Sequence, residues 1–165
     1  MDKIKRFLEC TVPVTSCNLD CSYCYIKQEN RRNKRLPFSN IDPETIGQAL
    51  STERLSWICY ISLCGAGETL MWKHITTLTN ELLKQGHYVN ITTNGTITQR
   101  FDEICKLPKE YLSHLHFAFS FHYLELKRTN QIDVFFENVD KIREAGCSFL
   151  RSEEHTSELQ SRQVI

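Results

Sequence analysis

Short apolar runs typical of β-strands alternate along this sequence with amphipathic runs typical of α-helices, and this alternation limits the possible folds more than any other feature. The strand-like runs occupy residues 7–15, 57–64, 88–92, 115–121 and 147–150. The helix-like runs between them occupy residues 42–51, 71–85, 99–106 and 134–145. Strands that alternate with helices pair in parallel through right-handed crossovers. The sequence therefore predicts an α/β fold built on a parallel sheet.

The number of repeats predicts an incomplete barrel. A closed eight-unit barrel takes about 250 residues, or about 30 per strand–helix unit. The 165 residues of this chain hold four complete units and the start of a fifth strand. We therefore expect an open, curved sheet whose last strand has an unprotected edge.

Composition excludes several classes of protein. The chain has 20 basic and 20 acidic residues and a formal net charge of zero, so it has no global field that attracts nucleic acid. No run comes close to the roughly 20 consecutive apolar residues that cross a bilayer. Eight cysteines without a recognisable secretion signal favour a reducing compartment. We expect a cytoplasmic protein with no membrane partner and no evident nucleic-acid partner.

Three cysteines, Cys17, Cys21 and Cys24, stand within eight residues directly after the first predicted strand. An odd number of crowded thiols cannot all form disulfides, and thiolates select iron–sulfur clusters or zinc. A four-iron, four-sulfur cluster normally takes four cysteines, so three leave one iron open to an outside ligand. Because α/β folds place ligands at the carboxyl ends of strands, this loop is the predicted metal site.

The spacing C-x3-C-x2-C, with Tyr23 just before the last cysteine, resembles the motif of the radical SAM enzymes. The resemblance covers residues 7–150 and implies a parallel partial (β/α)6 barrel in which Cys17, Cys21 and Cys24 hold a 4Fe-4S cluster. It implies that S-adenosylmethionine (SAM) binds the open iron. One electron from a reductant such as a flavodoxin or ferredoxin then cleaves SAM to methionine and a 5′-deoxyadenosyl radical.

The resemblance also implies that this radical abstracts hydrogen from a substrate. A small molecule, a peptide and a partner protein all stay open as that substrate. No residue is assigned a catalytic role from the sequence, because substrate contacts are expected mainly from polypeptide beyond residue 150.

The segment after the second predicted strand resembles the glycine-glycine-glutamate motif of the same family. It consists of Gly65, Ala66, Gly67 and Glu68, followed by Thr69 where the family usually has proline. Small residues let the backbone approach a ligand closely, and the peptide groups together with Glu68 are expected to hold the SAM ammonium. Taken alone, such a segment is an ordinary tight turn between a strand and a helix.

Three further residues are expected to contact SAM by the same resemblance. Asn94 lies in the turn after the third strand, and Ser120 lies near the end of the fourth. Tyr23 is expected to pack on the SAM adenine. Asn94 and Tyr23 also have ordinary interpretations: a side-chain cap at a helix start for Asn94 and a core aromatic for Tyr23.

Two features near the predicted site can each be interpreted in two ways. His122 follows the fourth strand and is either a contact to substrate or SAM or an ordinary rim histidine. The segment 27–35 contains Arg31, Arg32, Lys34 and Arg35. It is either a solvated loop or a clamp for an anionic substrate or a partner.

The last 15 residues resemble something other than an evolved protein. From Arg151 to Ser161 the sequence resembles the conceptual translation of a common sequencing adaptor. We therefore predict a radical SAM core domain over residues 1–150, truncated within its partial barrel, and a non-native tail over residues 151–165. The alternative is an ordinary polar C-terminal helix.

Two other functions stay open beside a radical SAM enzyme. The chain is alternatively an inactive, truncated fragment of such an enzyme. The other alternative is a zinc-binding interaction module. Structural zinc usually takes four protein ligands in two separated pairs, and the sequence contains no second pair.

Overall fold

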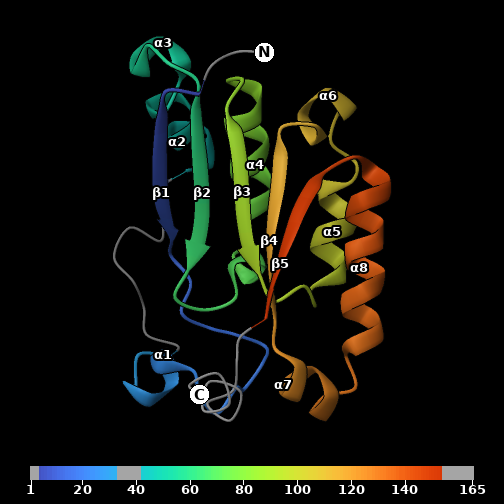
Figure 1. Cartoon of the computed structure of the whole chain (residues 1–165). Helices are drawn as coiled ribbons and strands as arrows, with labels where there is room; N and C mark the ends of the chain where they lie inside the picture. Colours follow the sequence, from blue (N-terminus) through green and yellow to red (C-terminus); the bar gives the residue numbers. More distant parts are fainter. Residues whose placement is uncertain (1–3, 33–41, 154–165) are drawn as a thin grey trace, which may run out of the picture.

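A computed structural model describes residues 4–32 and 42–153, and within these residues the strands form one sheet (Figure 1). The strands are Arg6–Val12 (β1), Cys59–Gly65 (β2), Tyr88–Thr93 (β3), Leu115–Phe121 (β4) and Ser148–Glu153 (β5). They lie in the order β1-β2-β3-β4-β5, and every neighbouring pair is parallel. The predicted α/β fold with an open, parallel sheet is therefore confirmed.

Helices cover one face of this sheet and its carboxyl end. They are Tyr25–Gln28 (α1), Pro43–Ala49 (α2), Thr52–Leu55 (α3), Ile75–Lys84 (α4), Thr98–Ile104 (α5), Lys109–Leu112 (α6), Tyr123–Arg128 (α7) and Ile132–Ala145 (α8), with a 3-10 turn at Thr69–Met71 (η1). The helices α4, α5 and α8 lie behind the sheet, whereas α1 and α7 lie beyond the tips of the strands (Figure 1). None of the described helices is long and apolar enough to cross a membrane.

The core lies between the sheet and the helices behind it. Along β4, Leu115, Phe117 and Phe119 are fully buried, whereas the alternate residues are only half-buried. Phe119 packs against Phe101 of α5 and Phe135 of α8, with ring centroids 5.9 and 5.5 Å apart. Burial of each such ring contributes about 1.5–3 kcal/mol, which fixes β4 against the helical layer.

The predicted start of the helix at residues 71–85 was wrong. The structure has the η1 turn first and begins α4 only at Ile75. Glu68 caps this turn by accepting a hydrogen bond from Leu70 N at 3.0 Å, and Trp72 then has an extended backbone that interrupts the helix. The predicted end was correct, because Gly86 has a φ of +80° and stops α4.

The fifth strand is longer than the sequence predicts. It extends through Glu153, three residues beyond the predicted end, and pairs with β4 along its whole length. Strand pairing depends on main-chain groups, so β4 can pair with residues 151–153 whatever their side chains are. The residues from 154 onward, which belong to the proposed tail, lie outside the described residues.

Candidate functional site

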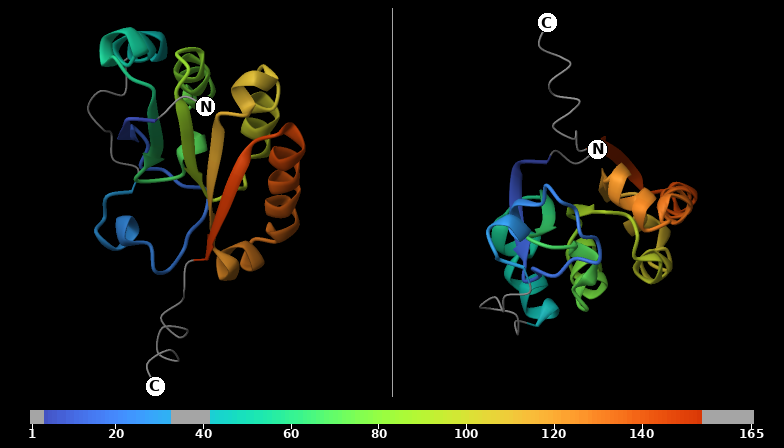
Figure 2. Two further views of the ribbon diagram at one scale, coloured as in Figure 1. Left: turned by 45° about the horizontal axis from the view of Figure 1, so that its top comes forward. Right: turned by 90° about the horizontal axis from the view of Figure 1, so that it is seen from below.

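All the residues predicted to bind the cluster or SAM line one cavity of about 330 Å³. They are Cys17, Cys21, Tyr23, Cys24, Gly65, Ala66, Gly67, Glu68, Asn94 and Ser120. The cavity lies where the chain leaves β1, β2, β3 and β4, that is, at the carboxyl end of the parallel sheet. The loop from β1 crosses this end of the sheet toward α7 (Figure 2).

Gly67 and Glu68, just after β2, hold the loop of residues 13–24 that carries the three cysteines (the cysteine loop) by close main-chain contact. Gly67 N donates to Val14 O at 3.0 Å, and Glu68 N donates to Ser16 O at 2.8 Å. A Cβ atom on Gly67 would lie 1.9 Å from Ser16 O. Only glycine therefore fits against Ser16, the residue that precedes Cys17.

Thr69 replaces the proline that the family usually has, and its side chain closes the same turn. Its hydroxyl accepts a hydrogen bond from Gly65 N at 3.1 Å, and the residue is buried. The hydroxyl thus satisfies a main-chain donor in residues 65–68 (the glycine segment), and the turn is built without proline.

Glu68 connects the ends of β2 and β3. Its Oε1 accepts hydrogen bonds from Thr93 Oγ1 at 2.6 Å and from Leu70 N, and its Oε2 accepts from Asn94 N at 2.7 Å. The side chain is buried, and burial raises the pKa of this carboxyl although the three hydrogen bonds act to lower it. Both carboxylate oxygens are thus engaged by protein donors.

Asn94 reaches from the end of β3 to the cysteine loop. Its Nδ2 lies 3.7 Å from Cys17 Sγ and donates to Asn18 Oδ1 at 2.9 Å. Asn18 Nδ2 in turn donates to Thr96 Oγ1 at 2.7 Å. Two residues of the cysteine loop are therefore hydrogen-bonded to the turn after β3.

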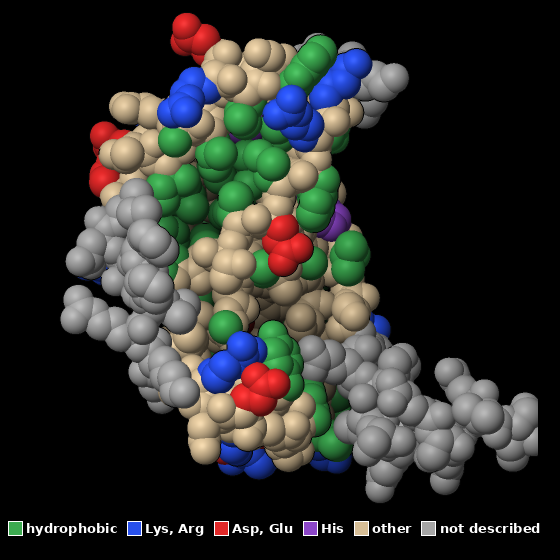
Figure 3. Space-filling model, turned by 90° about the vertical axis from the view of Figure 1, so that its left-hand side faces the viewer, with side chains coloured by type: hydrophobic (Ala, Val, Ile, Leu, Met, Phe, Trp, Pro, Cys, Tyr) green, Lys and Arg blue, Asp and Glu red, His purple; other side chains and the backbone are tan. Residues whose placement is uncertain are grey.

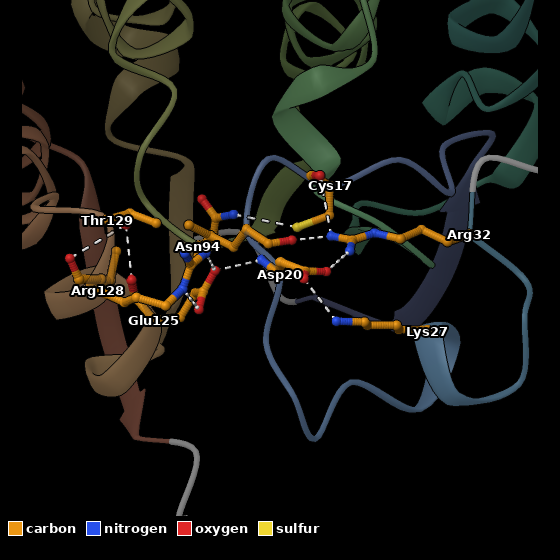
Figure 4. A network of polar contacts seen from close by, with 10 residues as sticks. Cys17, Asp20, Lys27, Arg32, Asn94, Glu125, Arg128 and Thr129 are labelled. Carbon is orange, nitrogen blue, oxygen red and sulfur yellow. Dashed lines mark hydrogen bonds and ion pairs between the residues drawn. The ribbon is translucent and has the colours of Figure 1, made fainter.

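A second group of polar side chains surrounds Asp20, in the middle of the cysteine loop (Figure 4). Arg32 donates to the main-chain oxygens of Cys17 and Leu19 and pairs with the Asp20 carboxylate. Lys27 of α1 pairs with the other oxygen of Asp20 at 2.8 Å. Of the four cations predicted to form a solvated loop or a clamp for an anionic substrate or a partner, Arg32 binds the chain's own cysteine loop, and the exposed Arg31 pairs with Glu29 at 2.9 Å. Lys34 and Arg35 lie outside the described residues.

The opposite side of the loop is fixed by α7. Glu125 Oε1 accepts a hydrogen bond from Asp20 N at 2.7 Å, and Arg128 donates to both Glu125 oxygens at 2.7 and 2.9 Å (Figure 4). The hydrogen bonds from Arg128 lower the pKa of Glu125, so this carboxyl is ionised at neutral pH. The cysteine loop is thus held between α1 and α7.

Tyr23 and His122 form a pair at the edge of the cavity. The Tyr23 hydroxyl lies 2.8 Å from His122 Nδ1, and both residues line the cavity. The Tyr23 ring is half-buried and packs against the edge of the hydrophobic core. This geometry keeps the ring at the cavity wall, where the family resemblance places the SAM adenine.

The donor set suits the predicted cluster. Three cysteines line the cavity, and thiols are the ligands that iron–sulfur clusters take. Burial raises the pKa of the Cys17 thiol, whereas the nearby Arg32 guanidinium acts to lower it. In the part of the chain that the structure describes, no three His, Cys, Asp or Glu side chains are placed to hold a single metal ion. A cubic cluster binds each cysteine at a different iron, so its ligands need not meet at one point.

Several residues that build the site were not predicted from the sequence. Asn18, Asp20 and Glu125 have no motif of their own, and the bond between Asp20 and Glu125 joins residues 105 positions apart. The only available signal was position: Asn18 and Asp20 lie between the cysteines, and Glu125 follows the fourth strand.

A family model described as the Radical SAM superfamily matches residues 11–151. Streptococcus suis SuiB bound to precursor peptide SuiA resembles the fold with a TM-score of 0.64 at 16% identity, covering 99% of this chain and 36% of that one. BtrN in complex with AdoMet and 2-DOIA gives a TM-score of 0.59 at 19% identity, over 93% of this chain and 58% of BtrN.

A third solved structure, S. suis SuiB bound to S-adenosylmethionine, gives a TM-score of 0.60 at 16% identity, over 96% of this chain and 35% of that one. The chain thus spans between about a third and three-fifths of the length of these proteins. No curated protein matches it. The family match extends over most of the chain and includes the cysteine loop, the glycine segment and the ends of β3 and β4, so the chain belongs to the radical SAM superfamily.

Proposed function

We propose that this chain provides the cluster-binding part and much of the SAM-binding part of a radical SAM enzyme. Cys17, Cys21 and Cys24 hold a 4Fe-4S cluster. The observation that carries the proposal is that these three cysteines share one cavity with residues from the ends of β2, β3 and β4. Side chains so far apart in the sequence gather there because all the strands end at the same edge of the sheet.

The cofactors supply the difficult chemistry, namely one-electron cleavage of SAM to a 5′-deoxyadenosyl radical that takes hydrogen from the substrate. The protein binds and orients them. The main chain of residues 65–67, which lines the cavity, would contact the SAM amino group. Ser120 offers its hydroxyl to SAM, and Tyr23 packs on its adenine. The Asn94 side chain is already hydrogen-bonded to Asn18 and Thr96, so Asn94 borders the SAM space through the turn after β3.

Glu68 has a different role in this proposal from the one that its motif suggests. Both of its carboxylate oxygens already accept hydrogen bonds from the protein. We therefore assign Glu68 to positioning the turns after β2 and β3, and leave the contact with the SAM ammonium to the neighbouring main chain.

The proposed partners are SAM, a one-electron reductant such as a flavodoxin or ferredoxin, and a substrate that is a small molecule, a peptide or a protein. The chain has eight cysteines, three of them proposed cluster ligands, and such a content suits a reducing compartment such as the cytoplasm. We also propose that residues 1–150 are the core domain and residues 151–165 a non-native tail. The family match ends at residue 151, next to that boundary. Sequencing the natural gene past codon 150 tests this division.

Anaerobic reconstitution with iron and sulfide tests the function. The reduced protein is expected to give the electron paramagnetic resonance signal of a 4Fe-4S cluster, and SAM is expected to change that signal by binding the open iron. A variant with Cys17, Cys21 and Cys24 replaced by alanine should bind no cluster. The matched control, Cys105→Ala, removes a thiol that does not line the cavity and should keep both the cluster and the response to SAM.

Each contrary result points to one alternative. A cluster signal that ignores SAM means that the cofactor pocket is not functional in this chain. Failure to form a cluster supports an inactive fragment. Tight, stoichiometric zinc in place of iron supports a zinc-binding module.

A further inference from the structure

The side chain of Asn94 directs an N–H group toward the sulfur of Cys17. Asn94 Nδ2 lies 3.7 Å from Cys17 Sγ, a hydrogen-bonding distance for sulfur. Asn94 is 3% exposed, so water does not compete for this contact. A donor aimed at a proposed cluster ligand gives Asn94 a role beyond the SAM contact that the family resemblance implies.

The orientation of the Asn94 amide is fixed by its other hydrogen bonds. Its Oδ1 accepts from Thr96 N at 3.1 Å and from Thr96 Oγ1 at 2.7 Å. If the amide were turned over, its NH2 group would face the Thr96 main-chain donor. The Asn94 main chain is also fixed, because Asn94 N donates to Glu68 Oε2 at 2.7 Å. The N–H therefore stays directed at Cys17.

We propose that Asn94 is a positioning residue that raises the reduction potential of the cluster through the Cys17 sulfur. The inference rests on the proposed function, since it requires Cys17 to bind iron. When the cluster takes one electron from an external reductant, negative charge increases on its sulfur ligands, and no covalent bond forms or breaks. A hydrogen bond to a ligating sulfur stabilises that charge and makes reduction more favourable.

A redox titration of the reconstituted protein without SAM tests this role. Titanium(III) citrate serves as the low-potential reductant, and electron paramagnetic resonance measures the reduced fraction. Asn94→Asp replaces the N–H by a carboxylate oxygen and should lower the equilibrium constant for reduction about tenfold, which is about 59 mV for one electron. Asn94→Ala should give a smaller decrease, because it removes the donor without adding charge.

Two further variants separate the effect of the Asn94 N–H on the potential from general effects of charge and of local packing. Gln99→Glu makes the same amide-to-carboxylate change at an exposed position of α5 and should leave the potential unchanged, because solvent screens the charge. Thr96→Val removes the hydroxyl that holds Asn94 Oδ1 and should shift the potential in the same direction as Asn94→Ala. If Asn94→Asp assembles no cluster, Asn94→Ala and Thr96→Val decide the question.

The outcomes distinguish this inference from the proposed function. If the unmodified chain forms no cluster, the proposed function fails. If that chain forms a cluster that responds to SAM, but the Asn94 and Thr96 variants keep its potential, the inference is overturned. A role of Asn94 confined to SAM binding would weaken SAM affinity without shifting the potential measured in the absence of SAM.

Discussion

At the scale of single residues, Gly67 determines how closely the cysteine loop packs on the sheet. Its φ is not in the left-handed region, so glycine is needed for space rather than for conformation. Gly67→Ala brings a Cβ against the main-chain oxygen of Ser16 and should cost about 1–3 kcal/mol of unfolding free energy. Because Cys17 directly follows Ser16, we also expect less iron per protein after reconstitution and desalting.

Gly86→Ala is the control for this prediction. Gly86 has a φ of +80°, and a Cβ added there would meet no atom within 4 Å, so alanine costs roughly 1–2 kcal/mol through conformation alone. It should destabilise the chain to a similar extent while leaving iron binding intact. Equal iron loss in both variants would show that the effect comes from stability and not from the seating of the loop.

Glu68 is a second residue whose contribution to stability can be measured directly. Glu68→Gln replaces one acceptor oxygen by an NH2 group, which then faces a main-chain or hydroxyl donor inside the core. A buried donor left without an acceptor costs about 1–3 kcal/mol. Urea denaturation should show this loss, whereas Glu110→Gln, at an exposed position of α6, should leave stability unchanged. A Glu68→Gln variant as stable as the unmodified chain would contradict the positioning role of Glu68.

At the scale of elements, α7 holds the cysteine loop through one carboxylate. Glu125→Ala removes the acceptor for Asp20 N, and we expect iron to leave the reconstituted protein several-fold faster when a chelator is added. Glu125→Gln keeps an acceptor oxygen but loses the ion pair with Arg128, so it should restore slow release at least in part. The measurement is chelator absorbance against time at neutral pH.

Glu137→Ala supplies the comparison, since Glu137 is exposed on α8 and is not part of the cavity lining. It should release iron at the rate of the unmodified chain. Melting temperatures of all three variants show whether faster release accompanies general unfolding. If Glu125→Ala and Glu137→Ala release iron equally fast, α7 does not hold the loop.

The length and regularity of the hydrophobic pattern decided which helices and strands could be predicted from the sequence. The strand β4 was predicted with its observed limits because every second residue is a large apolar side chain. The helices α1, α3 and α6 have four residues and α7 has six, too few to show a helical period, and they were missed.

The residues of the candidate site also divide into those that the sequence predicted and those that it did not. The cysteines and the glycine segment form local motifs, so the sequence was enough to predict them as site residues. Asp20 and Glu125 are joined only because the loop after β1 crosses the sheet to the end of β4, and that path depends on the whole fold.

At the scale of the whole molecule, the sheet has edge strands with exposed apolar side chains. In the order observed for the described residues, β1 and β5 are the two edges. Phe7 on β1 is 63% exposed and Leu150 on β5 is 50% exposed. Hydrophobic side chains gather on the side of the molecule that carries β1 (Figure 3). Exposed strand edges of this kind pair with other chains.

We therefore expect the chain to self-associate at high concentration and expect lysine at either edge to oppose it. Burial of a phenylalanine or leucine contributes about 1.5–3 kcal/mol, so Phe7→Lys or Leu150→Lys should weaken association about tenfold or more. Sedimentation equilibrium measures the dissociation constant. Leu124→Lys is the control, because Leu124 is 57% exposed on α7, which lies beyond the tips of the strands and is not part of either edge strand. If all three lysine variants weaken association equally, general surface hydrophobicity rather than the strand edges drives it.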